Sequence, residues 1–432
     1  MSLELADLPD ATQAEAVLEL HALIYDRLVR LGPQGQPLPA LALSWEHDAQ
    51  ATKWRFKLRS GVKWQDGTPL AAEEVAAALA GQGLGASVHL EGAELEVDLN
   101  SPTPGLLATL ATGAGLTISH PAALTAAPPP GSPAALPIGT GPFRLALWEP
   151  GRRALLQAND DYWDGRPFVD FIEIQMGRAS RDALLDLELG KADLVELGPL
   201  ESRRAQQEGK EIWTSAPLEL LSLRFLPNRP AAQDRRVRLA LAESIDRAAI
   251  QKVLWQNYGE VTGSIFPASL SGYSFLFPAA MNLEEARRLR DALGAAPTLK
   301  MGYDARDTLA RLTAERVAVN AHDAGLTLEL VPLPEGWREK SGEAADLLVE
   351  RARLGGPTLA QAVGEAARTL GFPENGIDPE RIYLAEREFL DSFTVVPLIH
   401  VPELLGIGPR VKDWSATPWG AWRLEQVCLE GR

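Results

Sequence analysis

The stretch WRFKLRSGVKWQDGTP, residues 54–69, predicts a strand, then a turn, then the start of a helix. From Trp54 to Leu58, apolar and basic side chains alternate with period two, which is typical of a strand with one buried face. The run from Gln65 to Thr68 is expected to form the turn, because Gly67 can adopt a positive φ. Pro69 suits the first turn of a helix, and the acids of the following AAEEVAAALA lie near its positive end.

Similar patterns along the chain predict an α/β protein. Residues 88–99 alternate around Glu91-Gly92, which indicates a hairpin. Further strands are expected at 171–176, 192–197, 299–303 and 326–331, and helices at 180–189, 283–293 and 306–324, with one long amphipathic helix over 235–256. The order strand, helix, strand over 299–331 is a βαβ unit, so at least one part of the molecule has an α/β architecture.

Composition excludes several classes of protein. The 58 acidic and 42 basic residues leave a net charge of −16, which repels phosphate backbones and anionic lipid surfaces, so we expect no nucleic-acid partner. The single cysteine, Cys428, cannot form an internal disulfide. A hydrophobic fraction of 46% with 23% charged residues is typical of a chain that buries a large interior.

Membrane-spanning and leader segments are not evident in the sequence. No run approaches the about 18 apolar residues that a membrane span needs. Residues 101–143 contain no Asp, Glu, Lys or Arg, but their nine prolines prevent a continuous helix. The opening MSLELADLPD lacks the basic and apolar regions of a signal peptide. Two interpretations remain open: a cytosolic protein, or a chain that begins after a removed leader.

Catalytic motifs are also missing from the sequence. It contains no G-x-S-x-G, H-E-x-x-H, Walker A or C-x-x-C motif. The six histidines, at 21, 47, 89, 120, 322 and 400, include no close pair that one helix or turn could direct at a metal. We therefore expect a protein that is not an enzyme, with no catalytic residues, metal site or cofactor.

Several segments, taken in order, carry a resemblance to one known family. They are YDRLV (25–29), LALSWE (41–46), FKLRSGVKWQDGTP (56–69), IGTGPF (138–143), NDDYW (159–163) and DRRVRLALAESIDR (234–247). This set resembles the signature of the family 5 extracellular solute-binding proteins, the dipeptide, oligopeptide and nickel receptors of ABC importers. Most of these residues also have a structural interpretation, because their glycines, prolines and aromatic side chains suit turns and a core.

The resemblance implies an α/β, two-lobed fold of the periplasmic-binding-protein type, class II, in which two crossing segments act as a hinge. It also implies an extra subdomain in the first lobe and, because this chain is short, a shortened second lobe. Carried onto this chain, the first lobe comprises 1–45, 151–217 and 395–432, the extra subdomain 46–150, the second lobe 225–392, and the crossing segments 218–224 and 393–399.

The function implied is that of an extracytoplasmic receptor, which captures a small peptide-like or anionic solute between its lobes and presents it to the permease of an ABC importer. The implied location is the periplasm or another extracytoplasmic space. The resemblance also allows a lipid anchor on a longer precursor of this chain. Expected partners are the solute and the permease subunits, with the receptor itself a monomer. Two alternatives stay open: a sensor or other non-transport binding protein, and an enzyme with a dispersed cleft site.

One segment departs from the family pattern. Members that hold a peptide's free amine generally have an acid followed by Gly-Trp and Asp-Tyr-Pro-Asp-Pro, whereas residues 345–357 here are ADLLVERARLGGP. Asp346 fits the first acid, but Arg351 and Arg353 replace the later ones. A strand here would project both guanidiniums from one face, which suits a carboxylate or phosphate. The alternatives are that both are ordinary surface arginines, or that Asp346 or Glu350 supplies a carboxylate from a shifted register.

Four residues are candidates for ligand contact. They are Tyr25 in the first lobe, and Trp337, Arg351 and Arg353 in the second.

Overall fold

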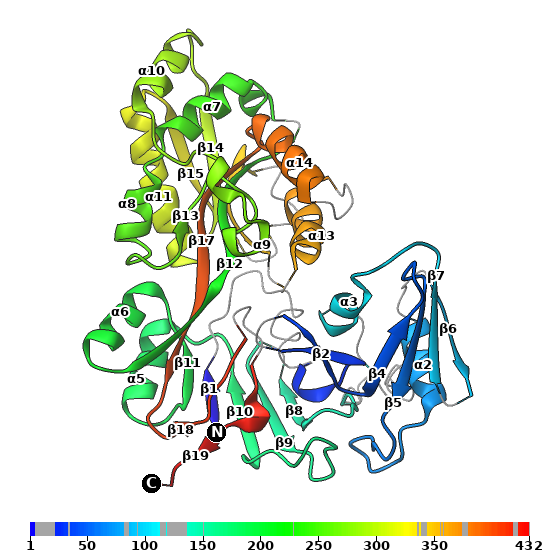
Figure 1. Cartoon of the computed structure of the whole chain (residues 1–432). Helices are drawn as coiled ribbons and strands as arrows, with labels where there is room; N and C mark the ends of the chain where they lie inside the picture. Colours follow the sequence, from blue (N-terminus) through cyan, green and yellow to red (C-terminus); the bar gives the residue numbers. More distant parts are fainter. Residues whose placement is uncertain are drawn as a thin grey trace, which may run out of the picture. The chain divides into compact units, whose positions relative to one another are not determined.

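The computed structural model (Figure 1) forms two compact units. Unit 1 comprises Met1–Leu197 and Leu405–Arg432, and unit 2 comprises Gly198–Leu404. The structure describes residues 1–4, 22–32, 35–81, 86–92, 94–112, 118, 136–149, 151–227, 229–334, 337, 344–354, 356, 358–373, 379–417 and 422–431. Most of the expected proline-rich stretch, 113–117 and 119–135, lies outside the described residues.

Unit 1 contains a four-stranded antiparallel sheet in the order β4 (Ala42–His47), β5 (Lys53–Leu58), β7 (Glu94–Leu99), β6 (Ala86–Glu91). The half-buried strand and the hairpin expected from the alternation are confirmed. One face buries Trp54 and Phe56 with helix α2 (Ala72–Ala80). The other face carries charged side chains, because the pleat sends alternate residues to opposite sides.

A second sheet of unit 1 has the order β11-β1-β10-β9-β8, and the last residues of β17, Leu405–Ile407, pair with β11. Segments from both ends of the chain therefore share one sheet. The remaining strands and helices of unit 1 are β1 (Ser2–Glu4), β2 (Val29–Leu31), β3 (Pro37–Pro39), α3 (Leu106–Thr112), β8 (Phe143–Glu149), β9 (Arg153–Ala158), β10 (Phe171–Gln175), α5 (Ser180–Glu188), β11 (Leu194–Glu196), β18 (Val411–Lys412), η4 (Leu424–Gln426) and β19 (Cys428–Leu429).

Unit 2 is an α/β layer structure around a sheet of order β15-β14-β16-β12-β17, with β13 paired to β17. Alternate residues of β12 enter separate cores: Leu221 packs in one core cluster with Val317 of α11, and Leu220 packs in another with Ala366 of α13. Helices therefore cover both faces of the sheet. The expected βαβ unit is confirmed as β14, α11 and β15, with β14 and β15 parallel.

The elements of unit 2 are α6 (Pro199–Gln207), β12 (Glu211–Phe225), η1 (Pro230–Ala232), α7 (Arg235–Ser244), α8 (Arg247–Val253), β13 (Glu260–Val261), α9 (Ala268–Ser271), η2 (Ser274–Leu276), α10 (Leu283–Asp291), β14 (Thr298–Asp304), α11 (Thr308–Asp323), β15 (Thr327–Leu333), β16 (Leu347–Arg353), α13 (Leu359–Leu370), α14 (Pro379–Asp391) and β17 (Val395–Ile407). The expected crossing segment 218–224 lies within β12, and 393–399 includes the start of β17.

The prediction of one long helix over 235–256 is wrong, because the structure divides it into α7 and α8. Ile245 is extended, with φ −84° and ψ 118°, and ends α7. The Asp246 side chain then accepts a hydrogen bond from the Ala249 amide at 2.9 Å and caps α8. The apolar periodicity continues across the break, so periodicity alone could not reveal it.

Within the described part of the chain, every helix is too short or too polar to span a bilayer.

Candidate functional site

Gln65 in unit 1 joins two of the segments that carry the family resemblance, 56–69 and 138–143, to Ile24, which directly precedes a third. Its side-chain amide donates to the Ile24 carbonyl at 2.9 Å and to the Phe143 carbonyl at 2.7 Å. Its side-chain oxygen accepts from the Gly139 amide at 3.0 Å. These bonds satisfy buried backbone groups that would otherwise be costly. The turn after β5 therefore fixes the chain around residues 24 and 139–143.

The glycines of the IGTGPF segment allow a close approach of two backbones. A Cβ built on Gly139 would lie 2.0 Å from the Ile24 carbonyl oxygen and 2.8 Å from Cδ1 of Tyr25. One built on Gly141 would lie 2.7 Å from the same carbonyl group. Only glycine fits such contacts. Tyr25 is thus half-buried against Gly139, and burial raises the pKa of its hydroxyl.

The Asp26 carboxyl group accepts hydrogen bonds from side chains of two segments of the resemblance, 138–143 and 159–163. Its carboxylate accepts hydrogen bonds from the Thr140 hydroxyl at 3.0 Å, the Trp163 indole at 2.8 Å and the Tyr162 hydroxyl at 3.3 Å. The side chain is buried, and desolvation raises the pKa of the carboxyl to about 7 although these donors lower it. The polar atoms of these two aromatic side chains are therefore used within the scaffold, which agrees with their structural interpretation.

In unit 2, Arg351 and Arg353 lie two residues apart on β16, so they project from the same face of the sheet as the alternation predicts. Arg351 pairs with Glu219 of β12, with Nε at 2.9 Å from Oε2, and its guanidinium carbon lies 5.6 Å from the ring centroid of Trp255. Arg353 pairs with Glu403 of β17 at 2.6 Å. We call Arg351, Arg353, Glu219 and Glu403 the β16 charge cluster.

The partners of the two arginines change the sequence interpretation. Their side chains are 22% and 25% exposed, so they are neither fully solvent-facing nor unopposed cations. Sequence reasoning missed Glu219 and Glu403, because only the strand pairing brings them beside β16. Glu219 is in register with Arg353 across β12 and β16. The sequence pattern within either strand does not predict that pairing.

The two alternative acids of this segment are already paired elsewhere. Asp346 accepts hydrogen bonds from Arg229 at 2.9 Å and from the Lys300 amide at 2.8 Å. Glu350 is fully buried and pairs with Arg224. It projects to the opposite face from Arg351, so a shifted register that would place its carboxylate beside the arginines is not what the structure shows.

Trp337 lies in the core of unit 2. Its residue is 4% exposed and packs with Leu226, Leu333 and Leu348. Its indole nitrogen donates to Asp304 at 3.0 Å. The structure therefore places Trp337 among core residues and offers almost none of its surface to a ligand.

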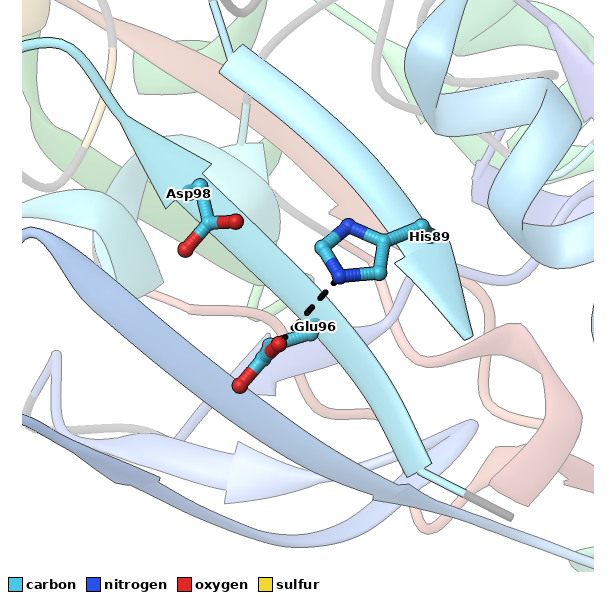
Figure 2. Close-up of side chains that lie close together, drawn as sticks. All are labelled: His89, Glu96 and Asp98. Carbon is cyan, nitrogen blue, oxygen red and sulfur yellow. Dashed lines mark ion pairs between the residues drawn. The ribbon is translucent and has the colours of Figure 1, made fainter. Parts of the chain in front are cut away.

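A candidate metal-ligating group lies in the four-stranded sheet of unit 1. Figure 2 shows His89 on β6 beside Glu96 and Asp98 on β7. Among the described residues, these three offer ligand atoms within 4.8 Å of one another. The sequence search missed the group because it looked for pairs of histidines, whereas this group combines one histidine with two carboxylates.

Known proteins similar to this chain agree with the resemblance. Residues 36–83 and 84–353 match the family model described as bacterial extracellular solute-binding proteins, family 5 middle. The nickel-binding protein NikA of Staphylococcus aureus is 24% identical over 451 residues, covering 93% of this chain and 88% of that protein.

Solved structures share the fold. NikA from Brucella suis in complex with Fe(III)-EDTA superposes with a TM-score of 0.83 at 19% identity, covering 100% of both chains. DppA from Helicobacter pylori in complex with the peptide STSA superposes with a TM-score of 0.80 at 19% identity, covering 100% of this chain and 98% of that chain. The expected two-lobed α/β fold is thereby confirmed.

Proposed function

The chain belongs to the family 5 bacterial extracellular solute-binding proteins, and on that basis we propose that it is the solute receptor of an ABC importer. The family and the similar proteins are binding proteins. For this chain we propose stoichiometric binding without turnover, a location outside the cytoplasm, attachment of a longer precursor by a lipid anchor, and a monomeric state. A sensor role without transport remains the alternative, and co-purification with a permease would distinguish the two.

The mechanism that we propose is closure of two lobes on a hinge, with the lobe and crossing-segment bounds expected from the sequence. A solute that binds the closed form more tightly than the open form shifts the population toward the closed form. The permease can then distinguish loaded from empty receptor by conformation alone.

For the ligand, we propose a small peptide-like zwitterion that contacts Tyr25, Arg351 and Arg353. The observation that supports this class is the pairing of opposite charges in the β16 charge cluster. The amine of such a solute can pair with a glutamate of the cluster while its carboxylate pairs with an arginine. A bare anion would approach Glu219 and Glu403 together with the arginines, and like charges oppose its binding. Among similar proteins, DppA from Helicobacter pylori was solved with a peptide, which agrees with this class.

Calorimetric titration tests the ligand class with a dipeptide, its N-acetylated form and succinate. We expect the free dipeptide to bind at least about tenfold more tightly than either other compound, because a buried charge that loses its partner is costly. Arg353→Ala should weaken dipeptide binding. Arg311→Ala is the matched control, since Arg311 forms an exposed pair with Glu315 on α11, and it should leave binding unchanged.

Two results would contradict the proposal at different levels. Succinate binding as tightly as the dipeptide, or Arg353→Ala binding like the unchanged protein, would show that the charge cluster does not select a zwitterion. Reproducible release of a cleavage product would overturn the receptor function itself.

A further inference from the structure

The outer face of the β6–β7 hairpin brings three potential metal ligands together, and none of them is among the residues assigned to solute binding. His89 and Glu96 are directly opposite in the antiparallel register. Asp98 lies two residues beyond Glu96 on β7, so its side chain is on the same face. The imidazole Nε2 of His89 is 3.2 Å from Oε2 of Glu96 (Figure 2).

This spacing suits two ligands of one ion. Nitrogen and oxygen ligands about 2.1 Å from a zinc-sized ion, at angles between 90° and tetrahedral, are about 3.0–3.4 Å apart. The 3.2 Å between His89 and Glu96 falls within that range. All three ligand atoms lie within 4.8 Å of one another, and His89 is exposed enough to adjust by side-chain rotation.

The neighbouring strand orients the central carboxylate. Arg55 of β5 donates from Nε to Oε1 of Glu96 at 2.8 Å, which leaves Oε2 directed toward His89. Glu96 is 4% exposed, and the hydrogen bond from Arg55 fixes the orientation of its carboxylate. A carboxylate held by a second residue is a typical arrangement of a metal ligand and its support.

Asp98 has an oxygen available in the same place. Its Oδ1 is buried, and among the described residues the Lys53 ammonium pairs with it, with Nζ at 3.3 Å. Lys53 is 59% exposed, so an arriving ion can displace its ammonium into solvent at little cost.

We propose that His89, Glu96 and Asp98 bind a divalent transition-metal ion, such as Zn²⁺ or Ni²⁺, on the β6–β7 hairpin. One imidazole and two carboxylates suit these borderline ions, whereas Mg²⁺ and Ca²⁺ prefer oxygen ligands alone. Water fills the remaining coordination positions on the exposed side. This proposal does not depend on the proposed solute receptor function, because the two use different residues.

Titration of the whole chain with ZnCl₂ and with NiCl₂, followed by calorimetry, tests the site. His89→Gln and Asp98→Asn should each weaken metal binding by at least about tenfold, since loss of even an indirect support costs about 10–100-fold. Lys53→Met should strengthen it, because the competing cation is gone. His47→Gln is the matched control: His47 is an exposed histidine of the same sheet, on β4, and its variant should bind metal unchanged.

Four outcomes would overturn the proposal. The first is no saturable binding of either metal at millimolar concentration. The second is binding that survives both His89→Gln and Asp98→Asn, which would place the metal elsewhere, including at the solute site. The third is equal weakening by His89→Gln and His47→Gln, which would indicate unspecific binding to surface histidines. MgCl₂ binding as tightly as ZnCl₂ would also contradict the assigned ligand set.

Discussion

Replacement of Asp26 by asparagine should remove a large part of the pH dependence of stability. Burial raises the pKa of this carboxyl from 3.8 to about 7. A raised pKa means that the folded state binds the proton more tightly than the unfolded state, so this stabilisation is complete below about pH 4 and is lost as the pH rises through about 7. The asparagine side chain keeps the shape of the aspartate and cannot ionise.

The magnitude follows from the size of the shift. Each unit of pKa corresponds to about 1.4 kcal/mol, so a shift of about three units corresponds to about 4 kcal/mol between the two extremes. Between pH 5 and pH 8, the free energy of unfolding of the unchanged protein should fall by about 3 kcal/mol more than that of Asp26→Asn.

Urea-induced unfolding of both proteins at pH 5, 6, 7 and 8 measures this difference. Buried His400, whose pKa burial lowers to about 4, contributes with the opposite sign at low pH, but it does so equally in both proteins and cancels. Parallel curves for the two proteins over this range would refute the reasoning. So would a difference that grows toward low pH in favour of Asp26→Asn, because that would mean a lowered pKa held by Thr140, Tyr162 and Trp163.

Three further substitutions test the scaffold. Gly139→Ala should destabilise the fold by about 1–3 kcal/mol or more, because its Cβ would lie 2.0 Å from the Ile24 carbonyl oxygen. The control is Gly364→Ala, because no atom lies within 4 Å of the added Cβ there; equal thermal midpoints for the two variants would contradict the close approach at Gly139. Arg224→Ala should cost about 3–5 kcal/mol in urea unfolding, since it removes a cation that pairs with fully buried Glu350. A loss as small as that of exposed Arg311→Ala would show that the pair is unimportant. Asp246→Ala should cost about 1 kcal/mol through loss of the α8 cap, and an unchanged midpoint would argue that α7 and α8 join in solution.

Local patterns predicted the half-buried strand β5 and the β6–β7 hairpin, because alternation and turn residues are visible in a single segment. The same reasoning failed over 235–256, where the apolar period continues through the extended Ile245. The strand that carries Arg351 and Arg353 was predictable, whereas their partners Glu219 and Glu403 were not. Those contacts depend on strand order and register, which are set by packing over long separations in sequence.

The position of the hairpin turn decides which residues face each other on this sheet. Glu91 pairs with Glu94, which places His89 opposite Glu96, whereas a two-residue turn at Glu91-Gly92 would have placed His89 opposite Glu94. The expected turn therefore could not have located the ligand group. A search limited to histidine pairs overlooked it. Buried Asp26 is a different case, because burial of a motif acid follows from tertiary packing and leaves no local signature.

The pairing of Leu194–Glu196 with Leu405–Ile407 has a consequence for the order in which the chain can fold. Unit 2 is one continuous segment, so all of its strands exist once residue 404 has been synthesised. Strand β11 can pair with the end of β17 only after residues about 210 positions later have been synthesised. Until then this edge of β11 is exposed and can pair with other chains. Ribosome-bound intermediates and chains truncated near residue 400 should therefore aggregate through this edge, and a chaperone that covers it would protect the nascent protein until residues 405–407 have been synthesised.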